Sequence, residues 1–95
     1  MKKLEATFNY IGTLLVPEWV VNDCPKIGKC DDFIKEAREY DEVKEELAKI
    51  DPEQLRKELY EYGAWDDEQL SNHEDNLDRI LWVAIFDIYD LKNED

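Results

Sequence analysis

The sequence predicts a mainly α protein, a compact single domain of three to four helices over residues 1–95 with a long C-terminal helix at its centre. Residues 66–92 contain no Gly or Pro and place apolar side chains at helical spacing. Residues 31–50 repeat apolar side chains at intervals of three and four. Hydrophobic residues make up 43% of the 95 residues and aromatic residues 12%, which is enough for one core.

Residues 1–21 fit two structures, and the pattern favours a helix. The helical spacing comes from four apolar residues: Leu4, Phe8, Ile11 and Leu15. The stretch from Leu4 to Tyr10 also alternates as a strand does, and Gly12 would destabilise a helix. A short β-hairpin that turns near Gly12 is therefore the alternative.

Pro17 is expected either to end the first element or to occupy the first turn of a short one, PEWVVND, at residues 17–23. Proline is favoured in the first turn of a helix, where its missing N–H costs nothing. We expect its three apolar residues to enter the core: Trp19, Val20 and Val21.

Residues 31–50 predict one amphipathic helix of about five turns. Its apolar face consists of Phe33, Ala37, Tyr40, Val43, Leu47 and Ile50. A second helix follows, because Asp51 is a good cap and Pro52 suits the first helical position. We expect that helix to bury Leu55, Leu59 and Tyr62 and to end at Gly63. Trp65 is expected to fill the space between this helix and the last one.

The last helix is predicted to begin at Asp66, with Gln69 completing a variant of the capping box. Its main apolar stripe consists of Leu70, Leu77, Leu81, Ala84, Ile88 and Leu91. The second half also carries three aromatic residues outside this stripe: Trp82, Phe86 and Tyr89. This half must be covered on two sides, by the rest of the domain or by self-association.

The chain is strongly acidic, with 25 Asp and Glu against 12 Lys and Arg and a formal net charge of -13. Residues 1–30 carry +1, so residues 31–95 carry -14. This charge opposes direct binding to nucleic acid or to an anionic membrane. We therefore expect a partner that is basic or neutral.

Catalysis, metal binding and cofactor binding have little support. Cys24 and Cys30 fit neither a zinc knuckle nor a CxxC motif, although a disulfide between them is geometrically possible and their redox state stays open. His73 is the only histidine and is expected to be structural or on the surface. The three glycines are isolated, so no phosphate-binding loop is present. We expect a protein that is not an enzyme and uses no cofactor.

The protein is expected to be cytoplasmic. Glu5, Pro17 and Glu18 interrupt the N-terminal apolar segment and argue against a signal peptide. No apolar run approaches the length needed to cross a membrane.

The candidate partner-binding residues are acidic and lie on two predicted helices: Glu36, Glu39, Glu42, Glu46, Asp67, Glu68, Glu74, Asp75 and Asp78. Asp67, Glu74 and Asp78 would share one helix side, rising by roughly 6 to 10 Å per step, a spacing of the same order as phosphates along a nucleic-acid strand. Such a surface would mimic nucleic acid. Charge runs are usually no more than solvated surface, and that alternative stays open.

Residues 62–84 contain a distinctive string: Gly63-Ala64-Trp65-Asp66, Gln69-Leu70, Asn76-Leu77 and Arg79-Ile80-Leu81-Trp82. This segment resembles one found in small, uncharacterised proteins of bacteriophages and mobile elements. The resemblance implies a setting in a host cell, where such proteins often bind a host protein. Acidic ones include inhibitors of restriction and CRISPR nucleases. We therefore expect an anti-defence inhibitor of a basic, nucleic-acid-binding host protein. The alternative is a non-catalytic structural or regulatory module that self-associates through Trp82, Phe86 and Tyr89.

Overall fold

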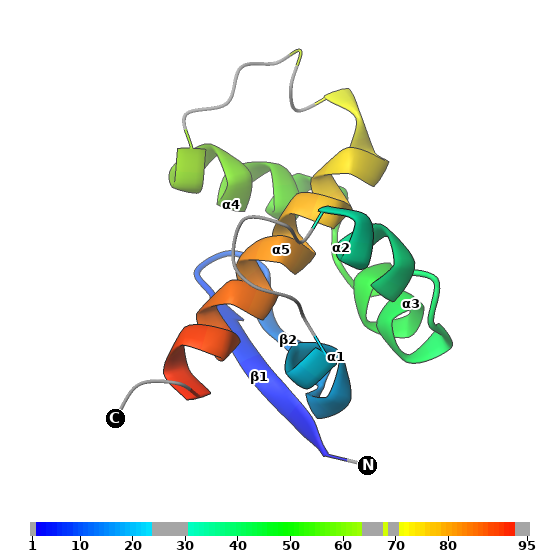
Figure 1. The fold of residues 1–95 in the computed structure, drawn as a ribbon. Helices are drawn as coiled ribbons and strands as arrows, with labels where there is room; N and C mark the ends of the chain where they lie inside the picture. The colour runs from blue at the N-terminus through cyan, green and yellow to red at the C-terminus, as the bar shows by residue number, and fades with distance from the viewer. Residues whose placement is uncertain (1, 24–30, 64–67, 69–70, 93–95) are drawn as a thin grey trace.

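The computed structural model describes residues 2–23, 31–63, 68 and 71–92. The elements in chain order are β1 (Lys3–Phe8), β2 (Gly12–Pro17), α1 (Glu18–Asp23), α2 (Asp31–Ala37), α3 (Asp41–Ala48), α4 (Pro52–Gly63) and α5 (His73–Lys92). The chain is thus mainly helical, as predicted. α5 runs through the middle of the molecule and packs against β1, β2, α1, α2 and α4 (Figure 1).

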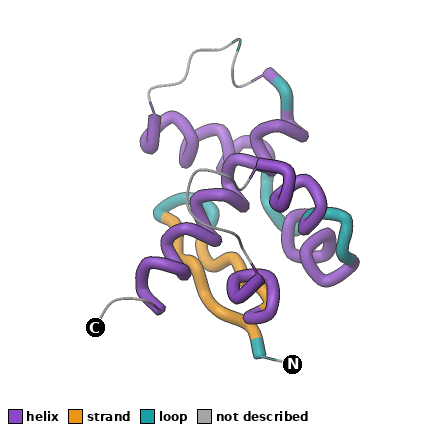
Figure 2. Tube along the Cα trace, viewed as in Figure 1, coloured by secondary structure: helices purple, strands orange, loops and turns teal. Residues whose placement is uncertain are grey.

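The N-terminal third is a β-hairpin, so the favoured helix was wrong and the alternative hairpin is confirmed (Figure 2). β1 pairs antiparallel with β2, with Ala6 opposite Leu14. Gly12 has φ +94°, in the left-handed region that glycine adopts without steric cost. Alternate residues therefore face one side, and four of them are buried: Ala6, Phe8, Leu14 and Val16.

α1 follows β2 directly and is tied to the start of the hairpin. The backbone N–H of Glu18 donates to the carbonyl oxygen of Lys2 at 3.0 Å. Val20 and Val21 are buried, as predicted, while Trp19 is half-buried and packs against the core. Hairpin and α1 thereby form one side of the core, along the second half of α5 (Figure 1).

The predicted five-turn helix over residues 31–50 is divided into α2 and α3. The N–H groups of Glu39 and Tyr40 each donate to a carbonyl three residues earlier, which tightens the end of α2. Tyr40 is extended, with φ -75° and ψ 137°, and α3 starts after it with two acidic residues in its first turn. The ring of Tyr40 meets the ring of Trp19 edge-on at 4.7 Å, so the break serves a contact between distant segments.

α4 begins as the sequence predicts. The N–H of Glu53 donates to the side chain of Asp51 at 2.9 Å, and Pro52 is the first helical residue. Leu55 and Leu59 are buried, as expected. Tyr62 was expected to be buried as well but is 51% exposed. Its ring lies edge-on to the ring of Phe8 on β1, with 6.2 Å between the ring centroids. The predicted role of Trp65 lies outside the described residues.

α5 begins at His73, so the prediction that the last helix starts at Asp66 was wrong. Glu68 lies in a turn, and the N–H of Ser71 donates to the carbonyl of Glu68 at 3.3 Å in a 3₁₀ turn. The predicted cap at Asp66, with Gln69, and the apolar residue Leu70 lie outside the described residues.

The second half of α5 supplies much of the core, as its nearly continuous apolar surface predicts. Five of its residues are buried: Ile80, Leu81, Ala84, Ile85 and Ile88. Leu91, assigned to the same stripe, is 67% exposed. None of the helices in the described ranges is long and apolar enough to cross a membrane.

Candidate functional site

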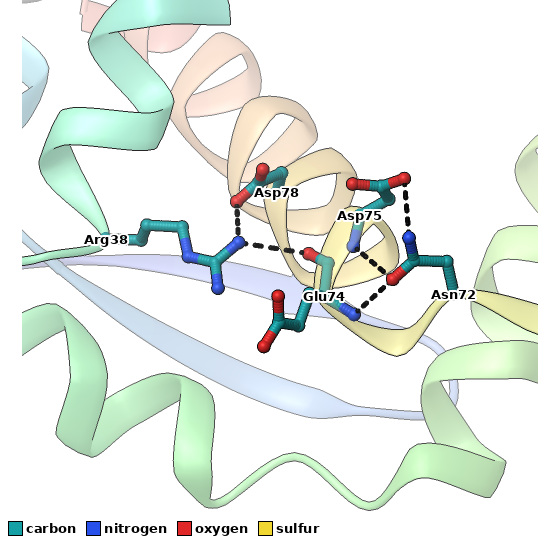
Figure 3. A network of polar contacts seen from close by, with 5 residues as sticks. All are labelled: Arg38, Asn72, Glu74, Asp75 and Asp78. Atoms are coloured by element: carbon teal, nitrogen blue, oxygen red, sulfur yellow. Dashed lines mark hydrogen bonds and ion pairs between the residues drawn. The ribbon is translucent and has the colours of Figure 1, made fainter.

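Arg38 joins the two acidic segments that the sequence singles out. It follows α2, and its Nη1 donates to Oδ1 of Asp78 on α5 at 2.7 Å (Figure 3). The same nitrogen donates to the carbonyl oxygen of Glu74 at 3.3 Å. The hydrogen bond to Asp78 is the largest influence that raises the pKa of Arg38. Residues 40 apart in sequence are thus held together by one guanidinium group.

Asn72 sets the start of α5 and the direction of its first acidic residues. Its Oδ1 accepts hydrogen bonds from the N–H groups of Glu74 at 3.1 Å and Asp75 at 3.3 Å (Figure 3). Its amide nitrogen donates to a carboxylate oxygen of Asp75 at 2.9 Å. Glu74 and Asp75 are exposed at the positive end of the helix dipole, which stabilises their negative charges.

We define the acidic cluster as four residues around Arg38: Glu39, Glu74, Asp75 and Asp78. The charges of Asp78, Glu74 and Glu39 each lie close enough to raise the pKa of Arg38. Glu39 is exposed and forms an ion pair of 3.6 Å with Lys44. Asp78 is half-buried and paired with Arg38, whereas Glu74 and Asp75 are exposed residues. The cluster therefore presents excess negative charge on one surface.

Five candidate partner-binding residues lie outside the acidic cluster: Glu36, Glu42, Glu46, Asp67 and Glu68. Glu36 on α2 and Glu68 are exposed. Asp67 lies outside the described residues. Because α5 starts only at His73, the phosphate-like spacing predicted for Asp67, Glu74 and Asp78 on one continuous helix does not hold.

Glu46 is buried, so its predicted place on an outer face was wrong. Its carboxylate accepts a hydrogen bond from the N–H of Leu15 on β2 at 3.2 Å and pairs with Lys49 at 2.5 Å. Burial acts to raise the pKa of Glu46, but the bonds from Lys49 and Leu15 outweigh it and lower the pKa. Glu42, one turn earlier on the same side of α3, is half-buried. Glu46 therefore belongs to the packing of the hairpin.

Glu58 is a buried acid that the sequence analysis missed. It is 1% exposed and accepts hydrogen bonds from the N–H groups of Asn9 at 3.1 Å and Tyr10 at 2.6 Å. The sequence pattern did indicate this burial, because Glu58 occupies the same helix face as Leu55 and Leu59. Glu46 has the equivalent position between Val43 and Leu47. Each glutamate lies within an apolar stripe and binds main-chain N–H groups of the hairpin.

An open pocket of about 580 Å³ adjoins the acidic cluster, between α2, α4 and α5. Its apolar walls include Ile34, Leu59, Trp82 and Val83. Its charged lining consists of Lys35, Asp75, Asp78 and Arg79. Asp75 and Asp78 belong to both the pocket and the acidic cluster, so the two features form one continuous surface.

The aromatic residues proposed for self-association lie partly at the surface of α5. Trp82 is 37% exposed, and its ring stacks on Phe86 with 4.0 Å between ring centroids. Phe86 and Tyr89 are half-buried and pack against the core. On the same helix, partial burial raises the pKa of Asp87, with a further contribution from Asp90.

The described part of the chain contains no group of His, Cys, Asp and Glu arranged to hold a metal ion. His73 is exposed at the start of α5. Cys24 and Cys30 lie outside the described residues. No protein-family model, no curated protein and no solved structure matches this chain. Fold and surface define the class: a mainly helical protein with an N-terminal hairpin, an acidic cluster and an adjoining pocket.

Proposed function

We propose that this chain is a non-catalytic inhibitor that binds a basic, nucleic-acid-binding host protein through the acidic cluster and the neighbouring Glu36. The observation that carries this proposal is the junction at Arg38. It brings Glu39 and Glu74, from two segments distant in sequence, to one surface. Residues 31–95 carry a formal charge of -14, so that surface belongs to a strongly negative region.

Such a surface suits competition with nucleic acid. Carboxylates on a folded surface offer a basic groove the negative charge that phosphates normally supply. Long-range attraction speeds the encounter, and salt weakens it. The expected resemblance of residues 62–84 to phage and mobile-element proteins is our reason for proposing a target among host defence nucleases, in CRISPR or restriction systems.

Affinity capture from host lysate tests this function with two matched variants. The cluster variant combines Glu39→Gln, Glu74→Gln and Asp75→Asn, and the control variant combines Glu45→Gln, Glu53→Gln and Asp23→Asn. Both remove three exposed charges, so they have the same net charge. At about 50 mM salt, wild type and control are expected to retain a nucleic-acid-binding protein that the cluster variant loses.

The captured protein is then assayed for nucleic-acid binding or cleavage with increasing amounts of each variant. Inhibition by wild type and control but not by the cluster variant supports the proposal. Recovery of no nucleic-acid-binding protein at low salt counts against it. Equal loss of binding in both variants would mean that total charge, and no particular surface, attracts the partner.

A second candidate function is self-association through Trp82, Phe86 and Tyr89, with the charge serving solubility. The observation that favours it is the stacked, partly exposed pair of Trp82 and Phe86. Light scattering on wild type and Trp82→Asp tests it. A wild type that is monomeric and unchanged in mass by the substitution removes this mechanism.

A further inference from the structure

We propose that the pocket between α2, α4 and α5 binds one large apolar side chain from a basic segment of the protein partner, while flanking Lys or Arg residues of that segment bind the acidic cluster. This inference rests on the proposed function, because it describes how the same partner is held. It adds an apolar anchor to a contact otherwise made by charge alone.

The walls of the pocket suit an apolar side chain. Ile34 and Leu59 line the pocket and are buried, 2% and 0% exposed. Trp82 is 37% exposed, so its ring is accessible to a bound group, and its stacking on Phe86 limits its freedom. Side chains that are ordered before binding lose little entropy on complex formation. Pockets of this kind hold the anchor residues that dominate interface energies.

The charges around the pocket select the occupant. Lys35 and Arg79 balance Asp75 and Asp78 in its lining, so the pocket itself is close to neutral and accepts an apolar group. The excess negative charge lies on the side of the acidic cluster, where Glu74 and Glu39 continue from Asp75 and Asp78. A segment with an apolar residue next to Lys or Arg matches both parts.

A second copy of this chain is a poor occupant by the same reasoning. Each copy carries a formal charge of -13, so bringing two acidic clusters together is opposed by repulsion. A basic segment gains from the same field. Charge complementarity therefore identifies the occupant as part of a basic protein.

Two short synthetic peptides of Lys and Arg test this inference on the full-length chain, one with a central phenylalanine and one with a central alanine. Fluorescence anisotropy at about 50 mM salt gives both affinities. The phenylalanine peptide is expected to bind wild type about tenfold more tightly, the effect of burying one large apolar side chain. It should also shift the methyl NMR signals of Ile34, Leu59 and Val83.

Trp82→Ala is expected to abolish the difference between the peptides and to leave binding of the alanine peptide unchanged. Leu91→Ala is the matched control, because Leu91 is a large exposed residue of the same helix and does not line the pocket. It should leave the tenfold difference intact. The comparison of peptides on wild type needs no substitution, so it decides the question even if Trp82→Ala fails to fold.

Equal binding of both peptides to wild type overturns the apolar anchor and leaves the proposed function standing. Binding of neither peptide at low salt removes both. A preference for phenylalanine that survives in Trp82→Ala places its site elsewhere and overturns the inference. The inference is also overturned if wild type is a dimer that Trp82→Ala dissociates and the phenylalanine peptide does not dissociate. The occupant of the pocket would then be a second copy of this chain.

Discussion

Removal of the Glu58 carboxylate should weaken the attachment of the hairpin to α4. Glu58→Ala leaves the N–H groups of Asn9 and Tyr10 without their acceptor. A hydrogen bond to a charged group contributes about 1.5–3 kcal/mol, and water can replace part of it because both residues are exposed. We expect a loss of about 2–4 kcal/mol in the free energy of unfolding.

A loss of that size is large for this chain, because the free energy of unfolding of a domain of about 95 residues is about 5–14 kcal/mol. It lowers Tm by at least about 8 °C. Glu58→Gln keeps one acceptor oxygen and should lose about half as much.

Urea unfolding followed by circular dichroism measures these changes, with Glu45→Gln as the exposed control. Amide hydrogen exchange at Asn9 and Tyr10 should accelerate in Glu58→Ala before global unfolding. Unfolding of Glu58→Ala at the same urea concentration as wild type would show that the carboxylate does not stabilise the hairpin. Equal destabilisation of the control would show that burial of the carboxylate is irrelevant.

Four further predictions concern local features of the fold. Because the pKa of Glu46 is lowered on folding, its stabilising contribution is present above the unfolded pKa and lost as pH falls through the folded pKa. The difference in urea stability between wild type and Glu46→Gln should therefore shrink below about pH 4. A difference that stays constant with pH would contradict this. Gly12→Ala should cost about 1–2 kcal/mol through its positive φ alone, since an added Cβ meets no atom within 4 Å; an unchanged Tm would argue against the turn conformation. Asn72→Ala should cost about 1 kcal/mol and speed exchange of the first amides of α5, and unchanged exchange rates would show that the cap is dispensable. A double-mutant cycle of Arg38→Gln and Asp78→Asn should give a coupling of about 0.5–1.5 kcal/mol in thermal melts, and zero coupling would show that the pair does not hold α2 to α5.

Elements fixed by local chemistry could be predicted from the sequence. Asp51 and Pro52 start α4 because their effects depend on neighbouring residues only. Gly12 marked the hairpin turn for the same reason, although helical spacing around it favoured the wrong choice. The first residues of α5 show the limit of local signals. Asn72 provides the cap in the structure, and the acidic residues before it suggested an earlier start.

Features that depend on distant contacts could not be predicted. The periodicity from Phe33 to Ile50 continues across Tyr40, so the break between α2 and α3 leaves no local trace, and Tyr40 meets Trp19 only in the folded chain. In the candidate site, acidic composition correctly indicated exposed Glu39 and Glu74. It did not reveal Arg38 as the residue that joins them.

Buried acids were the largest source of error at the candidate surface. Glu46 was expected at the surface because charged side chains are seldom fully buried, and Glu58 was not singled out at all. Their positions within apolar stripes indicated burial instead. The deciding fact is that the hairpin presents N–H groups of Leu15 and Tyr10 to them, which no pattern within α3 or α4 records.

The attachment of the hairpin to Glu58 also sets an order of events when the chain is made. Tyr10 precedes its acceptor by 48 residues. At a synthesis rate of about 5–20 residues per second, about 2–10 s pass before the acceptor exists. During that interval the strands have neither their buried carboxylates nor α5 to cover them, and a two-stranded hairpin alone is marginally stable. The hairpin is therefore synthesised well before the residues that it contacts, and chaperones would meet this chain with its hairpin uncovered.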